Sequence, residues 1–505
     1  MAPQPHALVP VAGVRFALDP ESLAGARSLA VIEHFDLALP ASNPLLLDCF
    51  RDRNRAQSAA TQFPNPQVPW AGEFVGKYLT HAAELYRLTR HSELRAVVTR
   101  VVKLLAKYQA SDGYCGAWPD AHRFSTSAWD AWSHYHVQIG CLLWHDAASD
   151  PTALEIATKI ASCLASTFTS AKQLLAMGSV GQNPATLHSM ACLYTRTKDP
   201  KLLHYCHLIL EQLQMPPCGD WLRNALAGKH FFKSTCPRWE GMCAIMGLAE
   251  LYHATGDAQM RQAFEFIFWD LCELERHNHG GMMSNEQACG SPYNTGSVET
   301  CATVTWGALT VEMLKLTGNS VVADELELSA LNSGLFLLSP SGRWCVYNSV
   351  MAGQRVSVDI TGAGVNRPAS SELFCCSCNG PRIMGLLSDW GVMALPDDNG
   401  YAINLFAAGS ITVPHGSQQL TFEQETDYPL DPKVKLTVSP SGGAATFTLQ
   451  IRVPCWSERT TIAVNSAPVS GVKPGSYCVI NRAWQPDDVV DIKLDFRLPS
   501  NSPTR

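Results

Sequence analysis

Apolar residues recur through most of the chain with the spacing of amphipathic helices. Val75 to Leu85 and Leu94 to Tyr108 are two such stretches, in which apolar positions return every three or four residues. A short turn containing Thr, Arg and His separates them, and similar turns further along contain Thr, Gly or Asp. These residue types are typical of the end of one helix and the cap of the next. The pattern predicts helices that come in pairs joined by tight turns.

The same turn returns roughly every 50–60 residues. Its copies are Leu85 to His91, Leu143 to Asp150, Leu193 to Asp199, Leu251 to Asp257 and Met313 to Asn319. With a sixth, hidden copy there would be six helix pairs, which in a ring form an (α/α)6 toroid; an open α-solenoid is the alternative. Long loops at Gly113 to His136 and Gly280 to Cys301 favour a closed barrel with one functional mouth. We expect the turns on one rim and these loops on the other.

The pattern changes after Pro396, where short alternating or β-branched segments are separated by turn residues. These segments are Ala402 to Leu405, Lys433 to Val438, Ala445 to Val453, Thr460 to Val464, Ser476 to Asn481 and Val489 to Leu494. They predict a C-terminal antiparallel β-sandwich, which a strand at Val14 to Leu18 could join. The expected domains are an N-terminal arm at 1–30, the helical barrel at 31–395 and the β-sandwich at 396–505.

Composition narrows the class of protein. Of 505 residues, 46% are hydrophobic and 16% charged, which indicates a large core. The net charge is −7 and no basic block occurs, so we expect no nucleic-acid partner. The apolar runs are too short for a membrane helix, and no basic segment precedes an apolar one at the start, so we expect a cytoplasmic protein. The 18 cysteines fit free, buried thiols in a reducing compartment.

One constellation of residues could carry chemistry. Glu299 and Cys301 are two residues apart, and Cys375 and Cys376 are adjacent. Three thiolates and a carboxylate can make a four-coordinate zinc site. The spacing alone leaves open the alternative that these are buried thiols in a cysteine-rich chain.

These segments resemble glycoside hydrolase family 127 (DUF1680), whose best-known members are β-L-arabinofuranosidases. The family pattern is Glu-Thr-Cys followed by Cys-Cys-x-x-Asn-Gly-x-Arg, matched here by residues 299–301 and 375–382. Further similar segments are Pro44 to Arg51, Trp70 to Leu79, Gln109, Asp112 to Tyr114, Ile451 to Trp456, Pro474 to Tyr477 and Arg482 to Trp484. The resemblance covers about residues 14–497. It implies an (α/α)6 catalytic barrel followed by a β-sandwich.

The resemblance also implies roles for individual residues. Cys375 matches the family's nucleophile, and Glu299, Cys301 and Cys376 match ligands of its zinc, which Cys375 also contacts. A zinc ion would hold the thiol as a thiolate at neutral pH. Glu286 is our choice for the acid/base, although its interval to Glu299 is shorter than in the family. Glu299 is the rival for that role if zinc is absent.

Four further residues are candidate substrate contacts, although a lone histidine is more often structural. They are His136, His188, Glu240 and Tyr347. Two extra cysteines, Cys289 and Cys378, depart from the family pattern and could compete as zinc ligands.

We therefore expect a zinc-dependent, retaining glycosidase with a cysteine nucleophile, acting on β-L-arabinofuranosides or a related sugar. The expected partners are a small-molecule or oligosaccharide substrate and a second copy of the chain in a homodimer, and no membrane partner is expected. A lyase, isomerase or cyclase using the same zinc and carboxylates is the alternative. A non-catalytic sugar-binding or scaffold protein is a third hypothesis, and the intact set of chemical residues argues against it.

Overall fold

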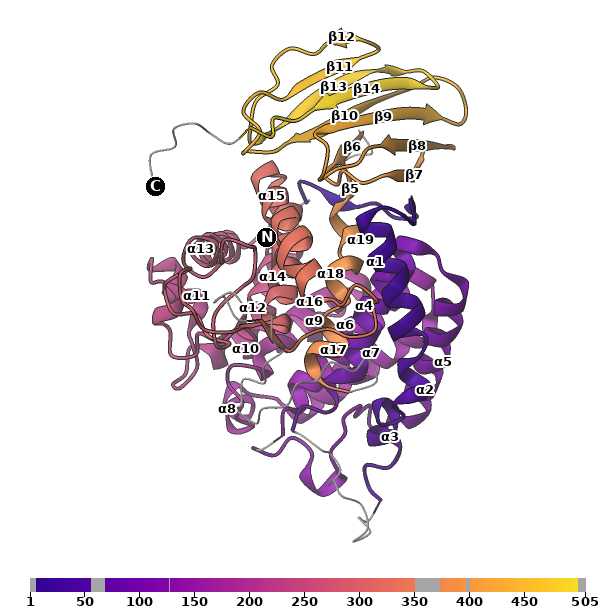
Figure 1. Ribbon diagram of the computed structural model, residues 1–505. Coiled ribbons are helices and arrows are strands. Elements are labelled where there is room, and N and C mark those ends of the chain that lie inside the picture. The colour runs from indigo at the N-terminus through magenta and orange to yellow at the C-terminus, as the bar shows by residue number, and fades with distance from the viewer. Residues whose placement is uncertain (1–5, 56–68, 127, 350–372, 397–399, 498–505) are drawn as a thin grey trace.

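A computed structural model describes residues 6–55, 69–126, 128–349, 373–396 and 400–497 of the protein. An α-helical domain is followed by a domain of two β-sheets, which lies across one end of the helices (Figure 1). The fold class expected from the sequence, mainly α with a C-terminal β domain, is confirmed. The expected domain limits at 30/31 and 395/396 stay a prediction.

The centre of the helical domain is a ring of inner helices. Its long members are α4 (Glu73–Thr89), α6 (Asp130–Ala148), α9 (Thr186–Thr197), α12 (Gly241–Thr255) and α14 (Thr300–Thr317). Each contacts the next in this order. The sixth position holds three short helices, α17 (Cys375–Asn379), α18 (Arg382–Gly385) and α19 (Leu387–Trp390). They contact both α14 and α4, so the inner contacts form a closed circuit.

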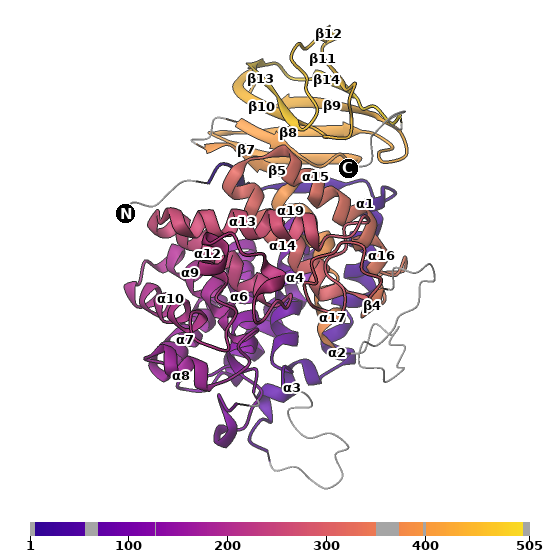
Figure 2. The same ribbon diagram turned by 90° about the vertical axis from the view of Figure 1, so that its left-hand side faces the viewer.

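Outer helices pack around this ring (Figure 2). They are α5 (Ser92–Tyr108), α7 (Pro151–Thr167), α10 (Pro200–Leu213), α13 (Ala258–Leu274) and α15 (Ser320–Leu328). In α5 only one face is buried, from Leu94 through Val98 and Val101 to Leu105, whereas α12 is buried on nearly every side. An amphipathic helix suits the outside of the barrel and an all-round apolar helix the inside.

The remaining helices are short and lie outside these pairs. They are α1 (Leu23–Val31), α2 (Leu39–Ser42), α3 (Leu45–Arg51), α8 (Ala171–Ala176), α11 (Trp221–Leu226) and α16 (Leu335–Leu337). Helix α1 packs against α18 and α4 and so covers the irregular sixth position of the ring.

The five tight turns between inner and outer helices share one construction. The residue after each inner helix is left-handed, with φ between 55° and 75°; these residues are Arg90, Ser149, Lys198, Gly256 and Gly318. The next residue caps the outer helix by accepting a backbone N–H; these residues are His91, Asp150, Asp199, Asp257 and Asn319. Both helix ends are thus satisfied within a few residues, which explains why the turn repeats in the sequence.

The β domain consists of two sheets. The smaller runs in the order β1 (Val9–Pro10), β5 (Val392–Ala394), β6 (Gly400–Ile403), β10 (Ala445–Val453) and β13 (Ser476–Trp484). The larger runs β12 (Ala467–Pro468), β11 (Thr461–Val464), β14 (Asp488–Lys493), β9 (Lys433–Pro440), β8 (Gln418–Glu425), β7 (Gly409–His415) and β2 (Arg15–Leu18). Phe422 of β8 and Phe447 of β10 meet between the sheets, with ring centroids 6.3 Å apart.

The β domain differs from expectation in three details. The pair β6 and β10 is parallel, in an otherwise antiparallel domain. The hairpin β7–β8 was not predicted, since Pro414 interrupts the first strand and polar residues fill much of the second. Strand β5 was not among the expected segments; it pairs with β6 and so joins the smaller sheet.

A buried ion-pair network fastens the β domain to α15. Arg452, on β10, is fully buried and donates to Asp324 at 2.5 Å and to Glu327. The rim that carries the tight turns faces this domain, since the Ala7 N–H donates to the Lys315 carbonyl beside one turn. The opposite rim, formed by the long loops, is the end where the predicted site residues gather.

Candidate active site

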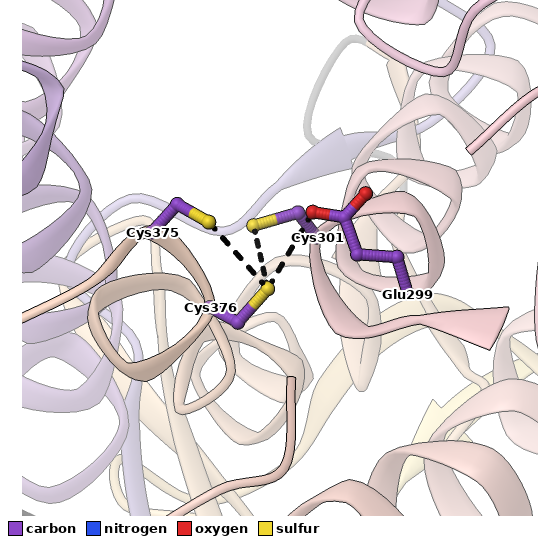
Figure 3. A group of neighbouring side chains, drawn as sticks. All are labelled: Glu299, Cys301, Cys375 and Cys376. Carbon is purple, nitrogen blue, oxygen red and sulfur yellow. Dashed lines mark hydrogen bonds between the residues drawn. The ribbon is translucent and has the colours of Figure 1, made fainter. Parts of the chain in front are cut away.

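Four predicted ligand residues converge at the loop end of the barrel. The ligand atoms of Glu299, Cys301, Cys375 and Cys376 all lie within 4.8 Å of one another. The Sγ of Cys376 is 3.7 Å from that of Cys375, 3.5 Å from that of Cys301 and 3.5 Å from Glu299 Oε1. All four side chains are buried and point toward a common centre (Figure 3).

Two helix starts bring these residues together. Glu299 ends the short strand β3 (Val298–Glu299), which pairs with β4 (Asn348–Ser349), and Cys301 lies in the first turn of α14. Cys375 and Cys376 begin α17, which packs against α14. A strand ends and a helix begins between Glu299 and Cys301. Their side chains can therefore face the same centre although the two residues, being two apart, could not share one helical face.

The cluster has the chemistry and the size of a metal site. Four ligands about 2.3 Å from one ion at tetrahedral angles lie about 3.8 Å apart, close to the separations found here. The second carboxylate oxygen of Glu299, Oε2, is buried and has no hydrogen-bond partner among the described residues. A buried carboxylate oxygen without a partner is costly unless a cation is near. The residues present therefore fit a bound metal ion.

The electrostatics single out Cys375 among the three thiols. Hydrogen bonds with the thiols of Cys301 and Cys376 lower the pKa of Cys375 well below its ordinary value, and the charge of Lys77 acts in the same direction. Burial raises the pKa of Cys376 and of Cys301. The thiolate in this cluster is thus favoured on the residue predicted to be the nucleophile.

A buried lysine beside the thiols was missed by sequence reasoning. Lys77 is 1% exposed, and its Nζ is 2.9 Å from Glu73 Oε1 and 3.6 Å from Cys301 Sγ. Its ammonium also lies over the rings of Trp132 and Trp239. The available signal was a Glu-x-x-x-Lys pair in an otherwise apolar stretch. Lys77 adds a positive charge to a cluster of acidic ligands.

Glu286 lies in the long loop between α13 and β3. Its carboxylate accepts from Arg238 at 2.6 Å and from the Tyr347 hydroxyl at 3.4 Å. Burial raises the pKa of Glu286, while the Arg238 guanidinium opposes that shift. Arg238 also pairs with Glu240 at 2.8 Å and was not singled out from the sequence. Arg238 thus joins Glu286 to Glu240, and Tyr347 contacts Glu286, so these three predicted residues form one connected group.

The two predicted histidines are about equally buried but differ in their partners. His136, on α6, is 8% exposed, and its Nε2 is buried without a partner among the described residues, against the ring of Trp132. His188, on α9, contacts the Tyr135 hydroxyl at 3.2 Å and lines a cavity that opens toward the turn end. His136 thus has a free polar atom to offer a ligand, whereas His188 already has a protein partner.

The two extra cysteines stay outside the cluster. Cys378 belongs to α17 and is buried, and the Ser377 hydroxyl lies 4.0 Å from its sulfur. Cys289 is exposed, and its sulfur contacts Asn294. Among the described residues, the metal-ligand group comprises Glu299, Cys301, Cys375 and Cys376.

The same fold occurs in solved glycoside hydrolases. One structure described as a glycoside hydrolase matches with a TM-score of 0.75 and 19% identity, over 98% of this chain and 79% of that one. A GH127 β-L-arabinofuranosidase from Geobacillus stearothermophilus T6 matches with a TM-score of 0.74 and 20% identity, over 95% and 81%. The two-domain architecture is therefore that of this class of enzymes.

The sequence comparisons identify the family. Residues 36–389 match the family described as the β-L-arabinofuranosidase GH127 catalytic domain, and residues 400–496 its middle domain. The chain belongs to glycoside hydrolase family 127 and is a glycosidase, so this expectation is confirmed. The non-reducing end β-L-arabinofuranosidase of Bifidobacterium longum is 25% identical over 480 residues, 84% of this chain and 70% of that protein.

Location and assembly were also expected from the sequence. Among the helices in the described ranges, none combines the length and apolar character needed to span a bilayer. The cytoplasmic location and the homodimer stay predictions.

Proposed function

We propose that the chain is a zinc-dependent, retaining glycosidase that acts on β-L-arabinofuranosides or a closely related sugar. The observation that carries the proposal is the convergence of three thiols and one carboxylate at the loop end of the barrel. Family membership supports the reaction class, and the names of the relatives support the sugar.

Zinc is the metal that this donor set suits best. Thiolate ligands favour zinc over magnesium or calcium, and four ligands match its tetrahedral preference. When bound, the ion would keep the cysteines deprotonated at neutral pH. Glu299, Cys301, Cys375 and Cys376 would hold it.

In the first step, the Cys375 sulfur would attack the anomeric carbon as the bond to the leaving oxygen breaks. Glu286, protonated, would donate its proton to that oxygen. In the second step, the Glu286 carboxylate would take a proton from water, whose oxygen attacks the same carbon and breaks the C–S bond. Two displacements on one carbon retain its configuration. Sulfur here replaces the carboxylate nucleophile of most retaining glycosidases.

The remaining predicted residues would bind and orient the sugar. His136 has an unpartnered buried Nε2, and Tyr347 reaches the Glu286 carboxylate. Glu240 accepts from Gln182 at 3.1 Å and from Arg238. We assign His188 to the same role, although the Tyr135 hydroxyl already occupies one of its ring nitrogens.

The test is a panel of 4-nitrophenyl glycosides that includes the β-L-arabinofuranoside. We expect hydrolysis of this substrate above the other members, with the β configuration in the first-formed product by proton NMR. Inversion of configuration would contradict the cysteine mechanism. Turnover of a sugar without uptake of oxygen from labelled water would instead support the lyase or isomerase alternative.

A further inference from the structure

The loop that carries Glu286 is fastened at both ends to a single residue, Glu275. Glu275 follows the last residue of α13, and its backbone carbonyl accepts from the Met283 N–H at 3.2 Å. Its side-chain carboxylate accepts from the N–H groups of Cys289 at 2.9 Å and Gly290 at 2.6 Å. Residues 283–290 therefore form a loop closed by Glu275, with Glu286 near its middle.

This loop contains backbone that needs external support. Met283, Asn285 and Glu286 have φ values of 56°, 53° and 66°, in the left-handed region that residues other than glycine rarely adopt. Such conformations persist where surrounding contacts hold them, and they concentrate at functional sites. The Glu286 carbonyl accepts from the Trp239 N–H at 3.2 Å, so the loop is also held on its inner side.

The Glu275 carboxylate is dedicated to this loop. It is 2% exposed, and its two oxygens accept from the backbone N–H groups of Cys289 and Gly290. Burial raises its pKa to about 7, and the two backbone N–H donors oppose the shift. A buried carboxylate is costly unless it is hydrogen-bonded, and here the bonds come from the loop of Glu286.

We propose that Glu275 is a positioning residue that holds Glu286 where its proton can reach the leaving-group oxygen. The inference rests on the proposed acid/base role of Glu286. Glu275 touches neither the thiol cluster nor Glu286 itself, so it acts through the backbone of residues 283–290. A displacement of about 1 Å at a reacting group can cost about 10²-fold in rate, which sets the expected scale.

Helix α13, which ends just before Glu275, provides a matched control. Asp270, on α13, also accepts a backbone N–H, from Phe231 at 2.7 Å, and contacts His230 Nδ1 at 2.6 Å, but Phe231 begins the short 3-10 helix Phe231–Lys233 and lies outside residues 283–290. Removing either carboxylate deprives a backbone N–H of its partner, so both changes should lower thermal stability. Only the change at Glu275 should disturb Glu286.

The experiment compares Glu275→Ala, Glu275→Gln, Asp270→Ala and Glu286→Gln with the unmodified enzyme. For each, kcat/KM is measured on 4-nitrophenyl and methyl β-L-arabinofuranosides, since the poorer leaving group depends more on the proton. We expect Glu275→Ala to lower kcat/KM about 10²-fold on the methyl substrate and only several-fold on the nitrophenyl substrate. Glu275→Gln keeps one acceptor oxygen and should show a smaller effect of the same kind. Asp270→Ala should leave unchanged the ratio of the kcat/KM values on the two substrates.

An unchanged ratio in both Glu275 variants, with a changed ratio in Glu286→Gln, would overturn the positioning role and leave the acid/base in place. An unchanged ratio in Glu286→Gln would remove the acid/base assignment and the positioning role with it. If Glu275→Ala does not fold, the ratio for Glu275→Gln decides.

Discussion

The two ends of the barrel are built in different ways. At the turn end, each connection caps its own helix ends: Asp257 caps α13, and the Thr255 hydroxyl accepts the Asp257 N–H at 3.3 Å. At the loop end, polar groups are left open or held by distant residues. Glu299 Oε2 has no partner within the described ranges, and the Glu286 loop depends on Glu275, eleven positions earlier. Contacts between neighbouring residues hold the turn end, whereas contacts between residues further apart in the sequence hold the loop end.

A cavity alone does not distinguish the two ends. A cavity of about 620 Å³ opens at the turn end and is lined by charged side chains. Its charges largely neutralise one another, since Lys315 pairs with Glu250 at 2.9 Å and Glu312 at 2.6 Å. The thiol cluster, by contrast, brings several acidic groups close together without enough positive charge nearby to balance them. A cluster of ionisable groups whose charges are not balanced therefore indicates the functional end more clearly than a cavity does.

The largest effect is expected from removing a ligand of the metal. Cys376→Ser should lose the bound ion and with it all measurable turnover, because Cys376 contacts the three other ligands. Metal analysis should return about one zinc per unmodified chain and much less in the variant. Cys378→Ser, a buried thiol outside the cluster, is the control and should keep its zinc. Equal zinc content in both variants would refute the metal site.

Replacement of the nucleophile should separate activity from metal binding and stability. Cys375→Ser should reduce turnover to background while the chain stays folded, since a hydroxyl is a far weaker nucleophile than a thiol at neutral pH. Circular dichroism and kcat on the aryl substrate measure the two properties. Turnover close to that of the unmodified enzyme would exclude a covalent step at this sulfur.

Arg238 should set the upper pH limit of the reaction. Its guanidinium lowers the pKa of Glu286 against the effect of burial, so Arg238→Gln should raise that pKa. A general acid must be protonated, and the alkaline limb of kcat/KM should therefore move up by about one pH unit. Arg261→Gln, at a surface pair with Glu265, should leave the limb in place. A shift to lower pH in Arg238→Gln would contradict Glu286 as the acid.

The smallest effect on activity is expected at the turn end. Asp257→Ala removes a helix cap and should lower the free energy of unfolding by about 0.5–2 kcal/mol. Gln259→Ala, an exposed neighbour that supplies the capped N–H from its backbone, is the control. Denaturant unfolding and kcat/KM on the aryl substrate measure both sides. A large loss of activity in folded Asp257→Ala would break the division between the two ends.

The same division explains what the sequence could predict. The five turns were visible because their left-handed and capping residues are neighbours along the chain. The sixth ring position was hidden, since α17 to α19 are short and lack that turn. Cys375 and Glu299 stand in recognisable motifs, and the structure brings the two side chains together. The roles of Lys77 and Glu275 depend on contacts with residues far away in the sequence, or on loop geometry, which periodicity does not reveal.

The most direct test of the reactive end is covalent trapping of the nucleophile. The unmodified enzyme is treated with a mechanism-based epoxide analogue of β-L-arabinofuranose, digested and examined by peptide mass spectrometry. We predict one adduct in the unmodified enzyme, on the peptide that contains Cys375. The Cys375→Ser variant, treated with the same reagent, should carry no adduct. An adduct on Glu286 or Glu299, with Cys375 unmodified, would contradict a sulfur nucleophile.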